Sequence, residues 1–214
     1  MTSEITVINM GANKNKLLNW AFWFGATVND VAKAIENGAD IHGRNRNKDT
    51  PLHIAAEESR LPEAILLLLN AGADVNARND DERTPLHLAC NTLETVRLFL
   101  DRGANAKAFD LYGRTPLYFA AGKSETLEIV KLLLDEDGDI NAREVFSRSP
   151  LHYAALNAGA ASEIIIEFLL DRDANGATRS DDGKTPFDYA KQNPRLQNTH
   201  ILTRLYNAQF NNPA

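Results

Sequence analysis

Apolar positions gather in short runs that return at a nearly constant interval along the chain. Four of these runs cover residues 64–69, 96–100, 129–134 and 164–170. Each is apolar at almost every position over one to two helical turns, a pattern that predicts a helix buried on most of its faces. Because one such helix cannot hide its apolar surface alone, we expect each to be stacked between neighbours.

A short motif stands before each apolar run and once more near the end of the chain. It starts with Thr or Ser followed by Pro, at positions 34, 31, 34 and 36 residues apart. Thr or Ser is a good helix N-cap, and Pro fits the first helical position because no partner is needed there for the N–H that it lacks. Each copy therefore predicts the start of a helix that precedes the apolar one. The copies are Thr50-Pro51-Leu52-His53, Thr84-Pro85-Leu86-His87, Thr115-Pro116-Leu117-Tyr118, Ser149-Pro150-Leu151-His152 and Thr185-Pro186-Phe187-Asp188.

A second landmark lies twelve residues before each motif. It is glycine in three copies and aspartate in two: Gly38, Gly72, Gly103, Asp137 and Asp173. Glycine after a helix closes it in the left-handed conformation at little steric cost. Aspartate adopts that conformation less readily, so we expect the turns at Asp137 and Asp173 to be strained or closed differently.

The period and the Thr-Pro-Leu-His motif resemble the ankyrin repeat family over residues 14–206. The resemblance implies an all-α solenoid of stacked helix-turn-helix units joined by β-hairpin-like finger loops. It also implies a non-catalytic module that binds a partner protein through its finger loops and its concave face.

We expect one domain over residues 14–214, with residues 1–13 unassigned and either a tail, an address or an extra turn. The expected units are an N-terminal cap (14–42), four full repeats (43–76, 77–107, 108–141 and 142–177) and a C-terminal cap (178–214). The caps are predicted to carry an aromatic-rich first helix around Trp20 and a last helix near residues 196–210. The second repeat is three residues short between its helices and the fourth is two residues longer, so irregular turns are expected there.

Charge and composition narrow the class of partner. The chain has 214 residues, 43% of them hydrophobic, and 23 basic against 29 acidic residues give a formal charge of −6. A net negative charge disfavours binding to the negatively charged backbone of nucleic acid. The longest apolar stretch, residues 17–26, is half of what spans a bilayer, so no membrane insertion is expected. We read this stretch as a cap helix and not as a signal peptide.

The single cysteine, Cys90, forbids an internal disulfide and fits a reducing compartment. We therefore expect an intracellular, cytoplasmic monomer, with secretion into a host cell left open. The resemblance also places Asn76 and Asn141 where some ankyrin repeats are hydroxylated, and the sequence leaves that modification undecided.

The residues that carry chemistry do not form a catalytic or metal-binding set. His53, His87 and His152 occupy the same motif position in different units, and helices packed 8–10 Å apart cannot bring them onto one zinc ion. The resemblance gives them a structural role at the turn before the first helix. The common catalytic signatures are absent from the sequence. We expect no enzyme, no cofactor and no bound metal, with an enzyme of another kind as the remote alternative.

The finger tips break the polar pattern expected of solvated loops. The third and fourth units carry Leu111-Tyr112 and Val145-Phe146 between tips that hold Asp80-Asp81 and Asp181-Asp182. Apolar clusters rimmed by charge mark interaction sites. The alternative is that these side chains only pack on one another and stiffen the fingers. The candidate partner-binding residues are Phe109, Leu111, Tyr112, Arg114, Val145, Phe146, Arg148 and Leu156. The protein would then be an effector or inhibitor of one protein, or a scaffold that joins two.

Overall fold

Five helices begin at the proline that follows the Thr or Ser of each motif. The N-cap residues Thr84, Thr115, Ser149 and Thr185 are extended, with φ between −86° and −97°, and the helix begins at the next residue. The motif therefore sets the first residue of each helix as expected. These first helices are α3 (Pro51–Glu58), α5 (Pro85–Leu88), α7 (Pro116–Lys123), α9 (Pro150–Leu156) and α11 (Pro186–Ala190).

The apolar runs form a second layer of helices behind the first. They are α2 (Val28–Glu36), α4 (Pro62–Asn70), α6 (Leu93–Asp101), α8 (Leu127–Asp137), α10 (Ser162–Asp171) and α12 (His200–Ala208). Within the first layer α3 packs on α5, α5 on α7, α7 on α9 and α9 on α11. The second layer runs in the same way from α2 to α12. Each helix thus buries its apolar side chains against helices about 33 residues away in the chain.

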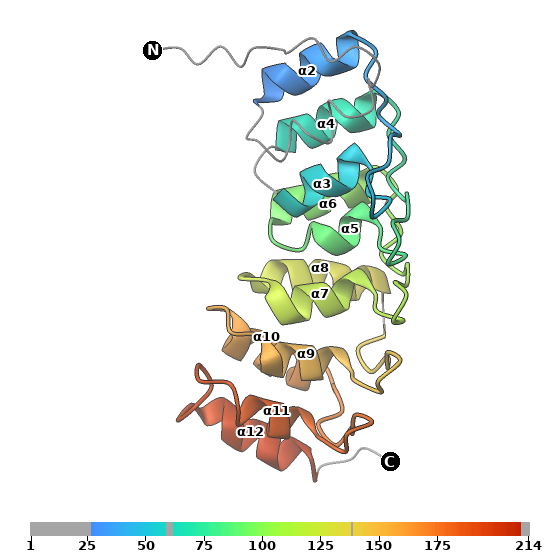
Figure 1. Cartoon of the computed structure of the whole chain (residues 1–214). Coiled ribbons are helices and arrows are strands. Elements are labelled where there is room, and N and C mark those ends of the chain that lie inside the picture. Colours follow the sequence, from blue (N-terminus) through green and yellow to red (C-terminus); the bar gives the residue numbers. More distant parts are fainter. Residues whose placement is uncertain (1–26, 59–61, 138, 211–214) are drawn as a thin grey trace.

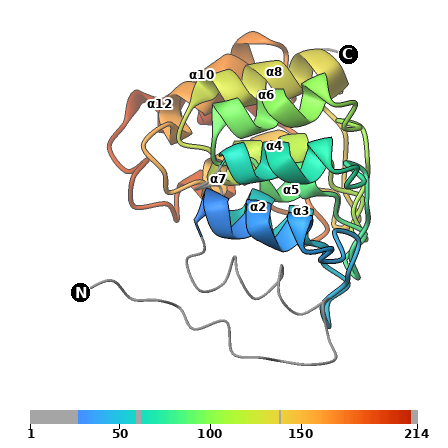
Figure 2. The same ribbon diagram turned by 90° about the horizontal axis from the view of Figure 1, so that it is seen from above.

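The computed structural model describes residues 27–58, 62–137 and 139–210. Figure 1 shows the helices stacked from α2 at one end to α11 and α12 at the other, with the connecting loops along one edge. The view along the stack in Figure 2 places these loops together on one side of the helices. In these ranges the fold is all-helical and holds no strand, which confirms the all-α solenoid.

The core is one continuous cluster that runs from Val31 in α2 to Leu205 in α12. Its largest side chains come from both layers, and Phe99, Leu117 and Leu133 are fully buried. The aromatic-rich first helix predicted around Trp20 and the segment 1–13 lie outside the described residues. The boundaries of the individual units stay a prediction.

The two length differences affect different parts of the units. In the short second unit the helix α5 is shortened and not the turn, since α5 has only four residues against eight in α7. The longer turn after α9 is held by Asn157, whose side-chain amide donates to the carbonyls of Ala121 and Ser124 at 3.1 and 3.2 Å. The last helix begins at His200 and not near residue 196, because Leu196 is buried in the turn before it.

Asp173 adopts the left-handed conformation expected at the end of a second-layer helix, with φ at 63°. Gly38, Gly72 and Gly103 occupy the same place with φ between 76° and 96°. The expectation of strain is therefore met at Asp173. At Asp137 the helix α8 ends against residue 138, which the structure does not describe.

Candidate functional site at the finger edge

Each finger is a five-residue hairpin turn whose geometry its own side chains impose. In the third finger the Gly113 N–H donates to the Asp110 carbonyl, and the Asp110 N–H donates to the Arg114 carbonyl, both at 2.9 Å. Gly113 has a φ of 76°, which makes this a type I turn followed by a left-handed residue. The Asp110 carboxylate accepts the N–H groups of Tyr112 and Arg114, each at 2.9 Å. The finger is therefore rigid before any partner arrives.

Backbone hydrogen bonds link each finger to the next. Along the edge the N–H of Asp80, Leu111, Val145 and Asp181 donates to the carbonyl of Asn47, Asp81, Tyr112 and Phe146, respectively, at 2.8–3.0 Å. One bond for each pair of fingers is too few for a strand, but it fixes their spacing. The expected hairpin character is present in the hydrogen bonds of the loops.

The motif histidines hold each finger to the helix of the preceding unit. The Nδ1 atom of His87 accepts the Thr84 backbone N–H at 3.0 Å, and its Nε2 atom lies 3.1 Å from the Arg114 carbonyl. His53 and His152 make the same pair of bonds. Burial lowers the pKa of all three, to about 4 for His87 and His152. The neutral ring with hydrogen on Nε2 satisfies both partners, so these residues are structural, as the resemblance implied.

Arginine braces the fingers at a position that the sequence reasoning missed. Six residues before each motif lie Arg44, Arg78, Phe109, Arg143 and Arg179. The Arg78 guanidinium donates to the carbonyl of Phe109 at 3.0 Å, and those of Arg44 and Arg143 donate to the same position of the next unit at 2.6 and 2.7 Å. The recurrence of arginine at one position of the repeat could have revealed this role. The third unit is the exception, because Phe109 replaces the arginine and cannot form these hydrogen bonds.

Replacing Phe109 by Arg is expected to raise the free energy of unfolding by about 1 kcal/mol, the net worth of one or two hydrogen bonds. The arginine would reach the Gly113 and Arg143 carbonyls as its counterparts do. Thermal unfolding followed by circular dichroism measures the change. As a control, Phe109→Lys adds the same charge without the planar fork and should stabilise less. Equal or lower stability of Phe109→Arg would contradict the brace.

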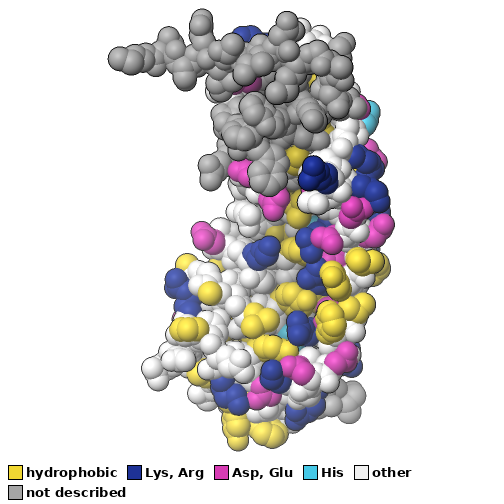
Figure 3. All heavy atoms as spheres, in the orientation of Figure 1, with side chains coloured by type: hydrophobic (Ala, Val, Ile, Leu, Met, Phe, Trp, Pro, Cys, Tyr) yellow, Lys and Arg dark blue, Asp and Glu magenta, His cyan; other side chains and the backbone are white. Residues whose placement is uncertain are grey.

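The apolar tips lie together and remain exposed. The rings of Tyr112 and Phe146 stack at 6.2 Å with 26° between their planes. Their exposed fractions are 37% and 46%, and those of Phe109, Leu111 and Val145 are 56–59%. We call these five residues the finger patch. Figure 3 shows apolar side chains gathered along the finger edge in the middle of the stack.

Two arginines flank the finger patch. The Arg114 guanidinium carbon lies 4.9 Å from the centre of the Tyr112 ring, and that of Arg148 lies 5.5 Å from the Phe146 ring. The structure does not bring Leu156 to the patch. This residue is the last of α9, about 9 Å along the helix axis from the finger end of that helix.

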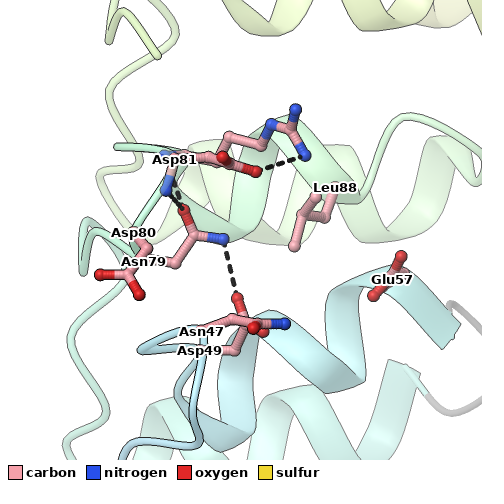
Figure 4. A pocket seen from close by; sticks show the side chains of 8 residues that line it. Asn47, Asp49, Glu57, Asn79, Asp80, Asp81 and Leu88 are labelled. Carbon is pink, nitrogen blue, oxygen red and sulfur yellow. Dashed lines mark hydrogen bonds and ion pairs between the residues drawn. The ribbon is translucent and has the colours of Figure 1, made fainter. Parts of the chain in front are cut away.

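A polar hollow of about 330 Å³ lies beside the patch, between the first two fingers and the helices α3 and α5. Figure 4 shows interactions of two of its carboxylates, those of Asp49 and Asp81. Asp49 accepts the Asn79 amide at 2.7 Å, and Asp81 lies 3.1 Å from an Arg83 guanidinium nitrogen. Asp80 pairs with Lys48 at 2.6 Å. These three carboxylates are therefore already engaged with groups of the protein itself.

The remaining chemistry-bearing groups assemble no second site. Among the described residues no group of three or more His, Cys, Asp or Glu side chains is placed to hold a metal ion. Cys90 is buried, and burial raises the pKa of its thiol to about 12, so it is unreactive. Asn76 uses both ends of its amide within the fold, since it donates to the Gly103 carbonyl and accepts the Asn105 N–H. No helix in the described ranges is long and apolar enough to cross a bilayer.

The comparison with family models matches ankyrin repeats in three copies, over residues 18–110, 58–144 and 123–213. Together the three matches cover nearly the whole chain. No curated protein matches the chain closely enough to add a partner or an activity. Ankyrin repeats are generally protein–protein interaction modules and typically non-catalytic. With the helix pairs, the finger hairpins and the motif histidines in place, the chain belongs to the ankyrin repeat family.

Proposed function

We propose that this protein binds one partner protein through the finger patch, with Arg114 and Arg148 at its rim. The observation that carries the proposal is the exposure of five large apolar side chains on two neighbouring fingers. Clusters of this kind mark interaction sites, and aromatic and arginine side chains dominate the binding energy of interfaces. The concave face formed by the first-layer helices would complete the contact.

A contribution to the stability of the fold does not by itself explain why the five residues of the finger patch are apolar and exposed. Phe109 lacks the hydrogen bonds that arginine forms at this position in the other units. Because 56% of its surface stays exposed, burial of the ring does not compensate for them. The Tyr112–Phe146 stack contributes about 0.5–1.5 kcal/mol, yet both rings keep more than a third of their surface open. Leu111 and Val145 are more exposed still. A partner that covers all five would bury this surface.

The double variant Tyr112→Asp, Phe146→Asp is expected to weaken binding of the partner at least 30-fold, because it places two charges at the centre of the contact. The free energy of unfolding should fall by no more than about 1.5 kcal/mol, the worth of the ring stack. Quantitative affinity capture from a lysate of the source organism identifies proteins that the variant no longer retains. Titration of the purified pair then gives the affinity.

The matched control is Ile164→Asp with Tyr206→Asp, which adds the same charge at side chains of similar exposure, 48% and 49%, away from the fingers. This control should retain the partner. Identical captures by all three proteins would overturn the proposal, and a large loss of stability in the finger variant would favour the packing role. One stoichiometric complex would indicate an effector or inhibitor, whereas two partners bound at once would indicate a scaffold.

A further inference from the structure

Two equivalent arginines at the base of the fingers are held in different ways. In the third finger Arg114 forms a fork on the Asp110 carboxylate, with Nε at 2.9 Å and Nη2 at 2.6 Å from the same oxygen. In the fourth finger Glu144 stands in place of Asp110 and Arg148 in place of Arg114. No carboxylate of the described chain lies within ion-pair distance of the Arg148 guanidinium. Arg148 is thus a flanking cation of the finger patch that forms no ion pair in the described chain, although the Tyr189 hydroxyl and the more distant Glu144 carboxylate both interact with it.

The extra methylene of glutamate explains the difference. The Oε1 atom of Glu144 accepts the Arg148 backbone N–H at 3.1 Å, as the Asp110 carboxylate does for Arg114. The longer side chain then leaves its other oxygen, Oε2, out of reach of the guanidinium. Glu144 is 4% exposed, and both its Oε2 atom and the Nε atom of Arg148 are buried without a hydrogen-bond partner in the described chain. One methylene therefore undoes a bond that the neighbouring finger makes.

The Arg148 guanidinium lies near two aromatic rings. Its central carbon is 5.5 Å from the Phe146 ring centre and 5.6 Å from that of Tyr189. The neighbouring cations are paired in contrast, since Arg83 lies 3.1 Å from Asp81 and Lys184 lies 2.8 Å from Asp182. Arg148 thus combines a guanidinium that forms no ion pair with an aromatic frame, and guanidinium groups bind carboxylates strongly through charge-assisted hydrogen bonds.

We propose that Arg148 selects the partner of the finger patch by binding a carboxylate that stands beside a large apolar side chain. The occupant is a protein segment in which Asp, Glu or a terminal carboxylate adjoins an aromatic or aliphatic residue. The apolar side chain lies on Tyr112 and Phe146 while the carboxylate pairs with the terminal nitrogens of the Arg148 guanidinium. This inference rests on the proposed function, because it assigns chemistry to the same surface.

Selection from a library of random 12-residue peptides displayed on phage tests the inference without a known partner. The protein, the variant Glu144→Asp and the double variant Tyr112→Asp, Phe146→Asp are each used as bait. Glu144→Asp should restore the fork seen at Asp110 and so occupy Arg148 without removing an exposed side chain. Peptides enriched on the protein should pair an acidic with a large apolar residue. Their affinity, measured by fluorescence anisotropy, should fall about 10- to 100-fold on Glu144→Asp.

Two further variants keep the test specific. Arg148→Gln should lose the same peptides, and Glu128→Asp, the same change in α8, should keep them. Enriched peptides that need the finger patch but show no acidic preference, or that bind Glu144→Asp equally well, would overturn the role of Arg148 and leave the proposed function standing. Selection that does not depend on Tyr112 and Phe146 would overturn both. Circular dichroism of every bait excludes unfolding as the cause.

Discussion

The free energy of unfolding should fall by about 3 kcal/mol for each of His87 and His152 as the pH drops from 6.5 to 4. Burial lowers the pKa of both side chains from 6.5 to about 4 in the folded protein. In this window the unfolded chain binds protons that the folded chain does not, so acid favours unfolding. The difference between a pKa of 6.5 in the unfolded chain and about 4 in the folded protein corresponds to roughly 3 kcal/mol for each residue.

The hydrogen bonds give the structural reason for this pH dependence. In His152 Nδ1 accepts the Ser149 backbone N–H, and Nε2 lies 3.2 Å from the Lys184 carbonyl. A proton on Nδ1 would convert this acceptor into a donor, which would then face the Ser149 N–H, itself a donor. It would also place a buried charge between two units. Because each histidine joins the helix of one unit to the finger of the next, protonation loosens the contact between repeats.

Urea unfolding at a series of pH values measures the effect, and His87→Gln provides the comparison. The variant should be less stable than the native protein at pH 7 and lose less stability between pH 6.5 and 4. Carboxylates affect the free energy of unfolding only at lower pH. Burial alone would raise the pKa of Asp188, but hydrogen bonds from Thr185 and the charge of Lys191 lower it to about 2. Stability that stays constant down to pH 4 would contradict the role of the histidines.

Replacement of Phe99 by Ala should lower the free energy of unfolding by about 3–5 kcal/mol. Phe99 is fully buried in α6, which packs on α4 and α8. The cavity would open in the second layer of helices, between α4 and α8. The loss would therefore affect the interfaces with both neighbouring units. Equilibrium unfolding in urea gives the change.

Phe109→Ala is the matched control because it removes the same side chain from an exposed position. With 56% of its surface open, Phe109 should contribute no more than about 0.5 kcal/mol. The two variants together separate a core phenylalanine from a surface one in adjacent parts of the chain. If both cost the same, the burial assigned to Phe99 would be wrong.

Local signals made much of the fold predictable from the sequence. Thr or Ser before Pro marked the first residue of each first-layer helix, since capping depends only on neighbouring residues. The apolar runs marked the second layer, and the register of the motif placed the longer turn after α9, whereas the deficit in the second unit shortened α5 itself. The last helix was placed less well, because nothing local showed that Leu196 is buried in a turn.

The finger patch was found from the sequence because apolar residues stood where the repeat calls for polar ones. Their exposure and the stack of Tyr112 on Phe146 needed the structure. The arginine brace was missed, although Arg44, Arg78 and Arg143 share one register position. The partners of these side chains are carbonyl groups about 30 residues away, and backbone atoms leave no mark in the sequence.

The sequence by itself determined the repeat, the order of the helices and the break in pattern at the third and fourth fingers, because each depends on residue type at fixed spacing. Only the tertiary structure decided which charges are paired. Asp110 and Glu144 are alike in charge and in register, yet one forms an ion pair with its arginine and the other does not. The difference of one methylene acts through distances between side-chain atoms, and these exist only once the chain is folded.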